Sequence, residues 1–401
     1  MILLSNSMFI PLKTKSVHCV ITSPPYWGLR DYGVEGQLGL EKTPEEYVGN
    51  MVKVFREVKR VLRDDGTLWL NLGDSYFGDS PTRKKSSEAF SETWEPLQTA
   101  SRGGLRRSAA RVGGLKPKDF CGIPWRVAFA LQADGWYLRS DIIWSKPNPM
   151  PESVTDRPTK AHEYVFLLSK SAKYFFDQEA VRERGNGWKN SNFDDPRDLE
   201  KHPNVGRKAR SPAGWKTGAG SHGSIHQDGR EQEIPYNEID HGRNIRTVWE
   251  IATQPFKEAH FATFPEELVK NCMFAGTSEK GCCPKCGVPW VRVVEKYGGT
   301  IGKGWHDHST DKTTGQRFID QDASHGRHGR EPYMVNSVGW QPSCDCGENP
   351  TPCTVLDPFI GSCTVGVVAQ KYNRKWVGCE LKMDYCKMGQ KRVFNTNIAM
   401  I

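Results

Sequence analysis

The sequence has few long apolar segments. Hydrophobic residues make up 37% of its 401 residues, below the roughly 45–50% of a typical globular domain. No apolar run approaches the ~20 residues of a membrane-spanning helix. The apolar opening stretch, Met1 to Leu12, lacks the basic flank and small-residue cleavage site of a signal peptide. Glycine and proline follow no period, and no internal repeat is visible. These absences exclude a collagen-like chain and a coiled coil, and we expect a cytoplasmic protein.

Positive charge is concentrated rather than spread. The formal net charge is +8, and between residues 80 and 118 nine Lys or Arg accompany only three acids. Such a stretch suits a polyanion such as DNA, because neutralising phosphates drives sequence-independent affinity. A solvated loop explains the same charge. Residues 182–246 and 300–337 are polar and rich in glycine or charge, so we expect loops or small insertions there.

The rest of the chain alternates between strand and helix patterns. The β-branched run His18–Thr22 stops at two prolines, and residues 45–62 have the apolar spacing of an amphipathic helix. Asp65-Gly66 is expected to end that helix before a strand at 67–72. The alternation predicts an α/β domain with a mostly parallel sheet. Further strands are expected at 137–144, 163–168, 354–356 and 376–379, and further helices at 124–133, 364–372 and from Asp384.

One candidate ligand-binding segment lies near the carboxyl end. Residues 354–366 form a predicted strand, a glycine-containing turn and a helix start, with Asp357 at the end of the strand. Glu380 follows 23 positions later and ends the next predicted strand, where an acid can accept hydrogen bonds from ribose hydroxyls. The pattern G-x-C-x-x-G is a poor dinucleotide fingerprint. An ordinary strand-turn-helix with a packing glycine is the alternative.

A second candidate segment is Thr22-Ser-Pro-Pro-Tyr-Trp27. Its two prolines fix the backbone just beyond a strand end and cannot donate hydrogen bonds. Ser23 and the Pro24 carbonyl can therefore accept from a substrate N–H group, and Tyr26 offers a ring for stacking. Considered alone, the segment also fits a proline-rich turn with a buried tyrosine.

Together, the two segments resemble the β-class amino-group DNA methyltransferases, which use S-adenosylmethionine. Residues 22–26 are similar to the catalytic motif of that family, and residues 357–362 to the methionine-binding end of its cofactor motif. The order, with catalysis first and the cofactor motif last, is that of the β class. Residues 141–166 and 260–268 extend the resemblance to about two-thirds of the chain, and the latter are similar to the segment that closes over the cofactor.

The resemblance implies a Rossmann-like S-adenosylmethionine-dependent methyltransferase fold with circularly permuted motif order. It implies a methyl transfer to the exocyclic amine of a flipped base in double-stranded DNA, with cytosine N4 favoured over adenine N6. A cognate restriction endonuclease is a possible partner. The catalytic residues it implies are Ser23, Pro24, Pro25 and Tyr26, and the cofactor-binding residues are Asp357, Phe359, Gly361, Ser362, Thr364, Glu380 and Phe264.

Four cysteines form two close pairs, Cys283-x-x-Cys286 and Cys344-x-Cys346, and a glycine follows each pair. Twelve cysteines in 401 residues are too few for a disulfide scaffold, whereas soft thiolates at this spacing suit a structural zinc ion in a small zinc-ribbon-like insertion. Cys282 is a competing ligand, and reduced thiols without metal are the alternative.

The motif positions predict how the domain is divided. The catalytic half covers 1–79, a basic insertion 80–118, the continued methyltransferase domain 119–181 and a target-recognition region 182–250. A cofactor-closing segment follows at 251–280, a zinc-binding insertion at 281–350 and the cofactor-binding half at 351–401.

Three other functions compete with this hypothesis. Carbon-5 cytosine methylation needs a cysteine nucleophile, and the single Pro-Cys pair, Pro352-Cys353, lies away from the Ser-Pro-Pro-Tyr loop. An RNA or protein methyltransferase is a weaker alternative. The third is a zinc-containing DNA-binding protein that keeps the fold but is catalytically weakened, because Cys363 stands where relatives usually carry glycine.

Overall fold

The computed structural model describes residues 1–29, 31–77, 114–183, 243–254, 264–297 and 334–396. These residues divide between two compact units. The first comprises residues 1–181, 245–293 and 338–401, and the second comprises residues 182–244 and 294–337. In the described part of the second unit, Glu183 and Arg243 form an antiparallel bridge and an ion pair of 2.9 Å. The residues of both predicted motifs belong to the first unit.

An eight-stranded sheet forms the centre of the first unit, in the order β1-β10-β9-β2-β3-β5-β4-β6. All neighbouring strands run parallel except for β5, which is antiparallel to both β3 and β4. The predicted mostly parallel α/β sheet is therefore confirmed. The strands are β1 (Ile2–Leu4), β2 (Val17–Thr22), β3 (Leu62–Leu72), β4 (Tyr137–Ser145), β5 (His162–Ser169), β6 (Val248–Glu250), β9 (Thr354–Asp357) and β10 (Lys375–Glu380).

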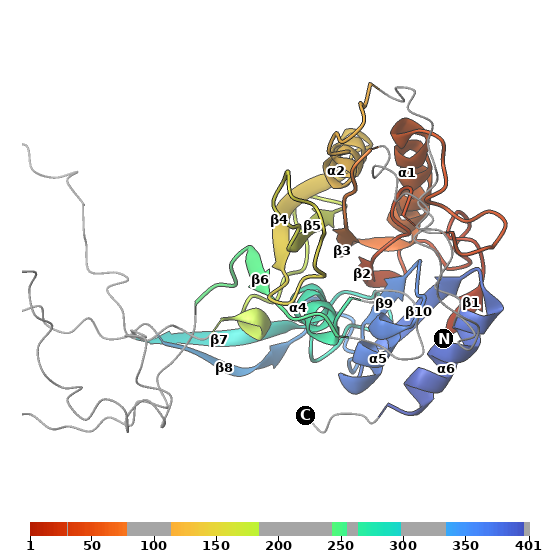
Figure 1. The fold of residues 1–401 in the computed structure, drawn as a ribbon. Helices are drawn as coiled ribbons and strands as arrows, with labels where there is room; N and C mark the ends of the chain where they lie inside the picture. Colours follow the sequence, from red (N-terminus) through yellow and green to blue (C-terminus); the bar gives the residue numbers. More distant parts are fainter. Residues whose placement is uncertain (30, 78–113, 184–242, 255–263, 298–333, 397–401) are drawn as a thin grey trace, which may run out of the picture. The chain divides into compact units, whose positions relative to one another are not determined.

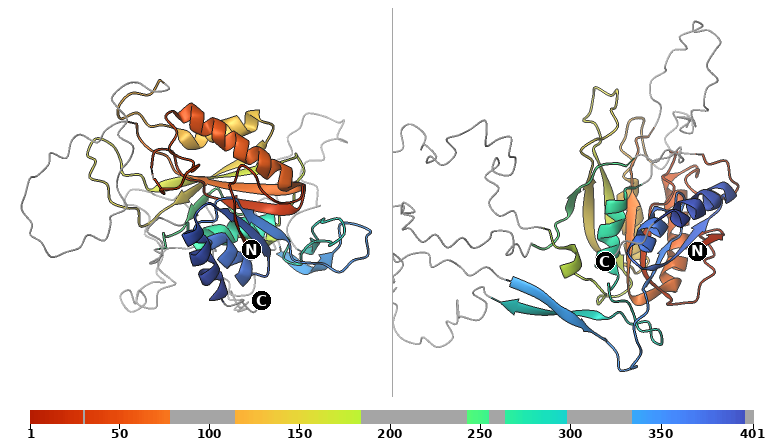
Figure 2. Two further views of the ribbon diagram at one scale, coloured as in Figure 1. Left: turned by 90° about the vertical axis from the view of Figure 1, so that its right-hand side faces the viewer. Right: turned by 90° about the horizontal axis from the view of Figure 1, so that it is seen from below.

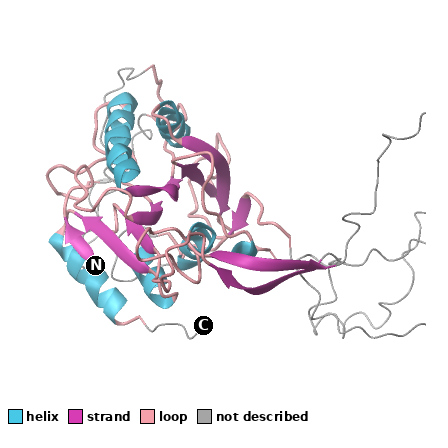
Figure 3. Cartoon of the chain, turned by 180° about the vertical axis from the view of Figure 1, so that it is seen from behind, coloured by secondary structure: helices cyan, strands magenta, loops and turns pink. Residues whose placement is uncertain are grey.

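Helices cover both faces of this sheet. Side chains along the central strands alternate: Val20 and Leu356 belong to one apolar cluster, and Cys19 and Val355 to the other. Helices α1 (Pro44–Val61) and α2 (Ile123–Ala133) cover the first face. Helices α4 (Glu266–Gly276) and α5 (Thr364–Lys371) cover the second, with α6 (Met383–Phe394) beside α5. Figures 1 and 2 show the two helical layers, and Figure 3 shows them from behind.

Local sequence explains why α1 begins where it does. Thr43 caps the helix by accepting from the Glu46 N–H, and Pro44 occupies the first turn. The prediction that Asp65-Gly66 separates helix from strand is wrong, because β3 begins at Leu62, directly after the helix. Gly66 lies instead near an irregularity in the pairing of β2 with β3, where a β-carbon would approach the His18 carbonyl to 2.9 Å.

Four strands escaped prediction: the three-residue strands β1 and β6, and β7 (Val291–Tyr297) with β8 (Met334–Gln341), which pair in a separate two-stranded sheet. The first residues of β8 lie in the polar window 300–337, where loops or small insertions were expected and no strand was predicted. A short 3-10 helix covers Glu179–Val181. In the described part of the chain, no helix has the length and apolar character needed to cross a membrane.

The order of the strands produces a topological switch point, the place where α/β folds have a ligand-binding crevice. From the central pair β9 and β2, the chain proceeds outward through α5 to β10 in one direction and through α1 to β3 in the other. The connections therefore leave the carboxyl ends of these two strands on opposite faces of the sheet, and ligands bind α/β sheets at such a switch point. The two predicted motifs follow β2 and β9 directly.

Candidate active site and cysteine cluster

A hydrogen bond joins the two motifs across the switch point. Thr22 Oγ1 donates to Asp357 Oδ1 at 2.7 Å, although 335 positions separate the two residues in the chain. The Phe359 N–H donates to the same oxygen at 3.0 Å. Asp357 is 1% exposed, and its Oδ2 atom has no hydrogen-bond partner among the described residues. Burial raises the pKa of Asp357 to about 7. A buried carboxylate oxygen that lacks a donor is a natural position for a ligand donor.

The turn after β9 is held from two sides. Glu380, at the end of β10, accepts from the Gly361 N–H at 3.0 Å, and burial raises the pKa of its carboxyl. Arg392 of α6 donates to the Ser362 carbonyl and to Thr364 Oγ1, each at 3.0 Å. The structure thus gathers the predicted cofactor residues of this half around one turn: Asp357, Phe359, Gly361, Ser362, Thr364 and Glu380.

Cys363 faces the helical layer and not the crevice. It precedes α5 with φ 62° and ψ 32°, a left-handed conformation that favours glycine. Its side chain is fully buried, and its β-carbon lies 2.8 Å from where a β-carbon on Gly389 of α6 would stand. A β-carbon on Gly366 would overlap the Cys363 sulfur. Two glycines on neighbouring helices therefore provide the space for this cysteine.

One hydrogen bond ties the Ser-Pro-Pro-Tyr loop to α1, and another joins its first and last residues. Tyr47 of α1 donates to the Pro25 carbonyl at 2.9 Å, so this carbonyl already has a donor. Ser23 Oγ donates to the Tyr26 hydroxyl at 3.3 Å. The Tyr26 ring lies against Gly73, where a β-carbon would stand only 2.9 Å from the ring atom Cδ2. Any side chain at position 73 would displace the tyrosine.

Sequence reasoning missed two side chains that meet the Tyr26 hydroxyl and a third that pairs with one of them. Its hydroxyl lies 2.7 Å from Glu163 Oε2 and 3.2 Å from Asn71 Oδ1, and Lys146 pairs with the other oxygen of Glu163. Burial, followed by the Glu163 charge, raises the pKa of Tyr26 well above its usual value. Glu163 and Lys146 fall within residues 141–166, which carry part of the family resemblance, but their pattern gave no sign of this contact.

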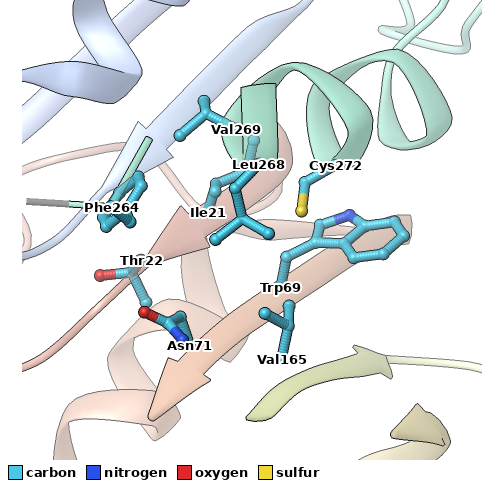
Figure 4. Close-up of a pocket in the computed structure, with 9 residues that line it drawn as sticks. All are labelled: Ile21, Thr22, Trp69, Asn71, Val165, Phe264, Leu268, Val269 and Cys272. Atoms are coloured by element: carbon cyan, nitrogen blue, oxygen red, sulfur yellow. The ribbon is translucent and has the colours of Figure 1, made fainter. Parts of the chain in front are cut away.

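Phe264 lies on the α4 side of the site. It lines a small, mainly apolar cavity together with Thr22 and Asn71 from the strand ends and Leu268 and Val269 from α4, as Figure 4 shows. The structure therefore places Phe264 close to the start of the Ser-Pro-Pro-Tyr loop. Of the predicted closing segment 251–280, residues 255–263 lie outside the described residues.

The four predicted zinc ligands come together. The sulfur atoms of Cys283, Cys286, Cys344 and Cys346 all lie within 4.8 Å of one another. Arg63 of β3 donates to the Cys286 carbonyl at 2.9 Å, and His18 of β2 bonds to the Gly287 carbonyl at 2.9 Å. The loop that carries the first pair is thereby fastened to the sheet. Four thiolates in such a group suit a tetrahedral zinc ion.

Cys282 belongs to a different group. It lies with His18 and Cys353, whose ligand atoms are also within 4.8 Å of one another. His18 Nδ1 accepts from the Thr354 N–H at 3.0 Å, so Nε2 carries the hydrogen given to Gly287, and neither ring nitrogen is left for a metal. Cys353 is fully buried and precedes β9, at the end opposite to Asp357. This position excludes it as a nucleophile for carbon-5 methylation.

Two expected DNA-contacting regions lie almost entirely outside the described residues. The basic insertion is described only from Gly114 onward, so most of its Lys and Arg residues lie outside the described part of the chain. Of the predicted target-recognition region 182–250, the structure describes 182–183 and 243–250.

Comparison with known proteins identifies the family. A model of the DNA methylase family matches residues 17–283 and 352–391. Type II methyltransferase M.Cfr9I of Citrobacter freundii is 35% identical over 97% of this chain and 86% of its own length. M.SmaI of Serratia marcescens is 34% identical over 95% of this chain and 86% of its own length. The solved structure of PvuII DNA methyltransferase (cytosine-N4-specific) is 15% identical, with a TM-score of 0.49, and covers 99% of this chain and 87% of that one.

The family model and the two Type II relatives define the class as DNA methyltransferases. The chain belongs to the DNA methylase family and is a methyltransferase of amino groups in DNA, cytosine N4 or adenine N6.

The buried Asp357 makes stability depend on pH. Its folded pKa of about 7 exceeds its ordinary value of 3.8. Its contribution to stability is therefore full below pH ~4 and is lost as the pH rises through ~7. Between pH 5 and 8, the unfolding free energy of the unaltered protein should fall by about 1–3 kcal/mol more than that of Asp357→Asn, because the asparagine cannot ionise. Urea denaturation of the ligand-free proteins measures both values. Asp156→Asn, at an exposed ion pair, is the control. Equal slopes for all three proteins would contradict the assignment.

Proposed function

We propose that this chain transfers a methyl group from S-adenosylmethionine to the exocyclic amine of a flipped base in double-stranded DNA, with cytosine N4 favoured over adenine N6. One observation carries the proposal: the 2.7 Å hydrogen bond from Thr22 to Asp357. This bond holds the carboxyl end of β2, which leads into the candidate catalytic loop, against the end of β9, which leads into the candidate cofactor turn. A methyl donor at one motif would then lie beside a base at the other.

The residues at the turn fit the proposed cofactor. The unpartnered, buried Oδ2 of Asp357 can accept a hydrogen bond, and the Glu380 carboxylate lies at the next strand end. With Phe359, Gly361, Ser362, Thr364 and Phe264, these residues would hold S-adenosylmethionine, which supplies an electrophilic methyl group when bound.

The candidate catalytic loop suits an amine substrate. An exocyclic amine is a poor nucleophile because its lone pair is delocalised into the ring. Hydrogen bonds from the amine to Ser23 and to the Pro24 carbonyl would favour a tetrahedral nitrogen, so that positioning supplies most of the catalysis. The Pro25 carbonyl, held by Tyr47, helps to fix the loop. The base must leave the duplex to reach this loop, and Tyr26 is the proposed stacking partner.

We propose DNA as the partner of the basic insertion and of the region 182–250, the former through phosphates and the latter through base edges. The net positive charge between residues 80 and 118 supports the first assignment. A cognate restriction endonuclease is a further proposed partner, consistent with relatives that are named Type II methyltransferases.

The first test asks which base is modified. The chain is expressed in cells that lack other DNA methylation, and the genome is sequenced by a method that reports modified bases. We expect one short sequence to carry N4-methylcytosine. Detection of N6-methyladenine instead would support the methyltransferase activity and change the assigned target base.

Ser23→Ala and Tyr26→Ala should each abolish most of the modification while cofactor binding stays within a few-fold, because both residues are proposed to touch the base. Near-normal methylation by either variant would contradict the assignment of that residue to the catalytic site.

The second test concerns Cys363. Because its side chain points into the helical layer, we expect the natural protein to bind S-adenosylmethionine measurably. Cys363→Gly relieves a left-handed residue but also removes packing against α6. It should therefore tighten binding by less than about tenfold, or ~1.4 kcal/mol. Calorimetry on both forms checks this. Binding seen only in the glycine variant would instead support the catalytically weakened DNA-binding protein.

The third test concerns zinc, which we propose is bound by Cys283, Cys286, Cys344 and Cys346. Protein purified without chelator should contain one zinc ion per chain by elemental analysis. Cys283→Ser should lose it, whereas Cys282→Ser, one position away but outside the group, should keep it. Removal of the metal should increase hydrogen exchange at residues 280–290 and 341–347 more than in the central sheet. Metal-free protein from a chelator-free preparation would rule the site out.

A further inference from the structure

A continuous chain of hydrogen bonds leads from the candidate catalytic serine to a carboxylate on another strand. Ser23 Oγ donates to the Tyr26 hydroxyl at 3.3 Å, and the Tyr26 hydroxyl donates to Glu163 Oε2 at 2.7 Å. Lys146 donates to Glu163 Oε1. The chain thus runs from the loop after β2 to β5 and the end of β4, and it joins a hydroxyl that is proposed to meet substrate to an ion pair.

The charged end fixes the direction of every donor in this chain. Tyr26 has one hydroxyl proton and two possible acceptors, Glu163 at 2.7 Å and Asn71 at 3.2 Å. The shorter bond to a charged oxygen is the stronger, so the proton points to Glu163. The Tyr26 oxygen then accepts from Ser23. Because Ser23 gives its own proton inward, its remaining lone pairs are left for an amine N–H.

Packing holds the side chains of this hydrogen-bond chain in place. The Tyr26 ring lies against Gly73, and the Asn71 amide donates to Glu163 Oε2 and to the Tyr164 carbonyl, each at 3.2 Å. The Lys146 and Glu163 side chains are 18% and 17% exposed. The Lys146 ammonium also lies 4.4 Å from the centre of the Trp144 ring. The carboxylate therefore has a fixed position and a compensating charge, with limited access to solvent.

From this arrangement we propose that Glu163 is the final acceptor of the proton that leaves the amine during methyl transfer, and that Ser23 and Tyr26 relay it. This rests on the proposed function. As the nitrogen lone pair forms the N–CH3 bond, the S–CH3 bonding pair passes to sulfur, and the nitrogen holds one proton too many. That proton passes to Ser23 Oγ, the serine proton passes to Tyr26, and the tyrosine proton passes to Glu163 Oε2. The product is a neutral methylated amine and a protonated Glu163, which returns the proton to solvent.

The first experiment removes links of the relay one at a time. Single-turnover methylation of duplex DNA is measured for Glu163→Gln, Tyr26→Phe and the double variant. Each single change should slow methyl transfer by tenfold or more, within the roughly 10²–10⁴-fold range of acid–base catalysis. The double variant should be no slower than the slower single variant, because both changes interrupt one chain. DNA affinity, measured by fluorescence anisotropy, should stay within about threefold. Glu57→Gln, at an ion pair on α1, is the matched control and should react normally.

The second experiment separates proton acceptance from support of the fold. Glu163→Ala leaves the Lys146 ammonium without its partner, so added formate can bind beside it and accept the proton from Tyr26. Formate should raise the rate of Glu163→Ala several-fold in a saturable manner, whereas chloride at equal ionic strength should not. In Tyr26→Phe/Glu163→Ala the hydroxyl is gone, and formate should have no effect. A merely structural role for Glu163 predicts no rescue in either variant.

The outcomes distinguish the relay from the function on which it rests. An unaltered chain that methylates no DNA overturns both. If the unaltered chain is active and Glu163→Gln matches its rate, the relay is wrong and the methyltransferase function stands. Additive losses in the double variant, or no formate rescue of a folded Glu163→Ala protein, overturn the relay in the same way.

Discussion

The site depends on one contact, the hydrogen bond between Thr22 and Asp357 at the centre of the sheet. The strands that carry these residues, β2 and β9, are neighbours in space and lie near opposite ends of the chain. Their connections leave in opposite directions, so the carboxyl ends open a crevice that neither strand could form alone. Ionising the Asp357 carboxyl in the folded protein is also costly, since burial raises its pKa. A ligand that donates to its free oxygen would offset part of that cost.

Residues near both ends of β2 hold other parts of the molecule in position. At the carboxyl end it positions Thr22 and the Ser-Pro-Pro-Tyr loop. Near the amino end, His18 bonds to the Thr354 N–H of β9 and to the Gly287 carbonyl in the cysteine loop. The cysteine cluster is therefore fastened to the edge of the sheet opposite to the candidate active site. This separation predicts that a zinc ion bound there would act through stability and not through the chemistry of methyl transfer, because the described cysteines of the cluster lie away from the switch point.

Cys363 shows how a departure from a family pattern is accommodated by distant positions. A cysteine in a left-handed conformation costs free energy, on the order of 1 kcal/mol, and its side chain needs room. Gly366 and Gly389 provide that room. The substituted side chain is thus accepted by the helical layer, and the turn that faces the crevice keeps Gly361, held by Glu380.

The sequence by itself determined the features that depend on neighbouring residues. These include the amphipathic helix predicted at 45–62 and found at 44–61, the main strands, the cysteine pairs and the two motifs, because periodicity and spacing are local properties. Only the tertiary structure decided the rest. The three-residue strands β1 and β6 are strands only because β10 and β4 pair with them. Cys282 and Cys283 are adjacent in sequence, yet their sulfur atoms belong to different groups. Glu163 reaches Tyr26 across 137 positions because β5 runs antiparallel to β3, a pairing that no local pattern encodes.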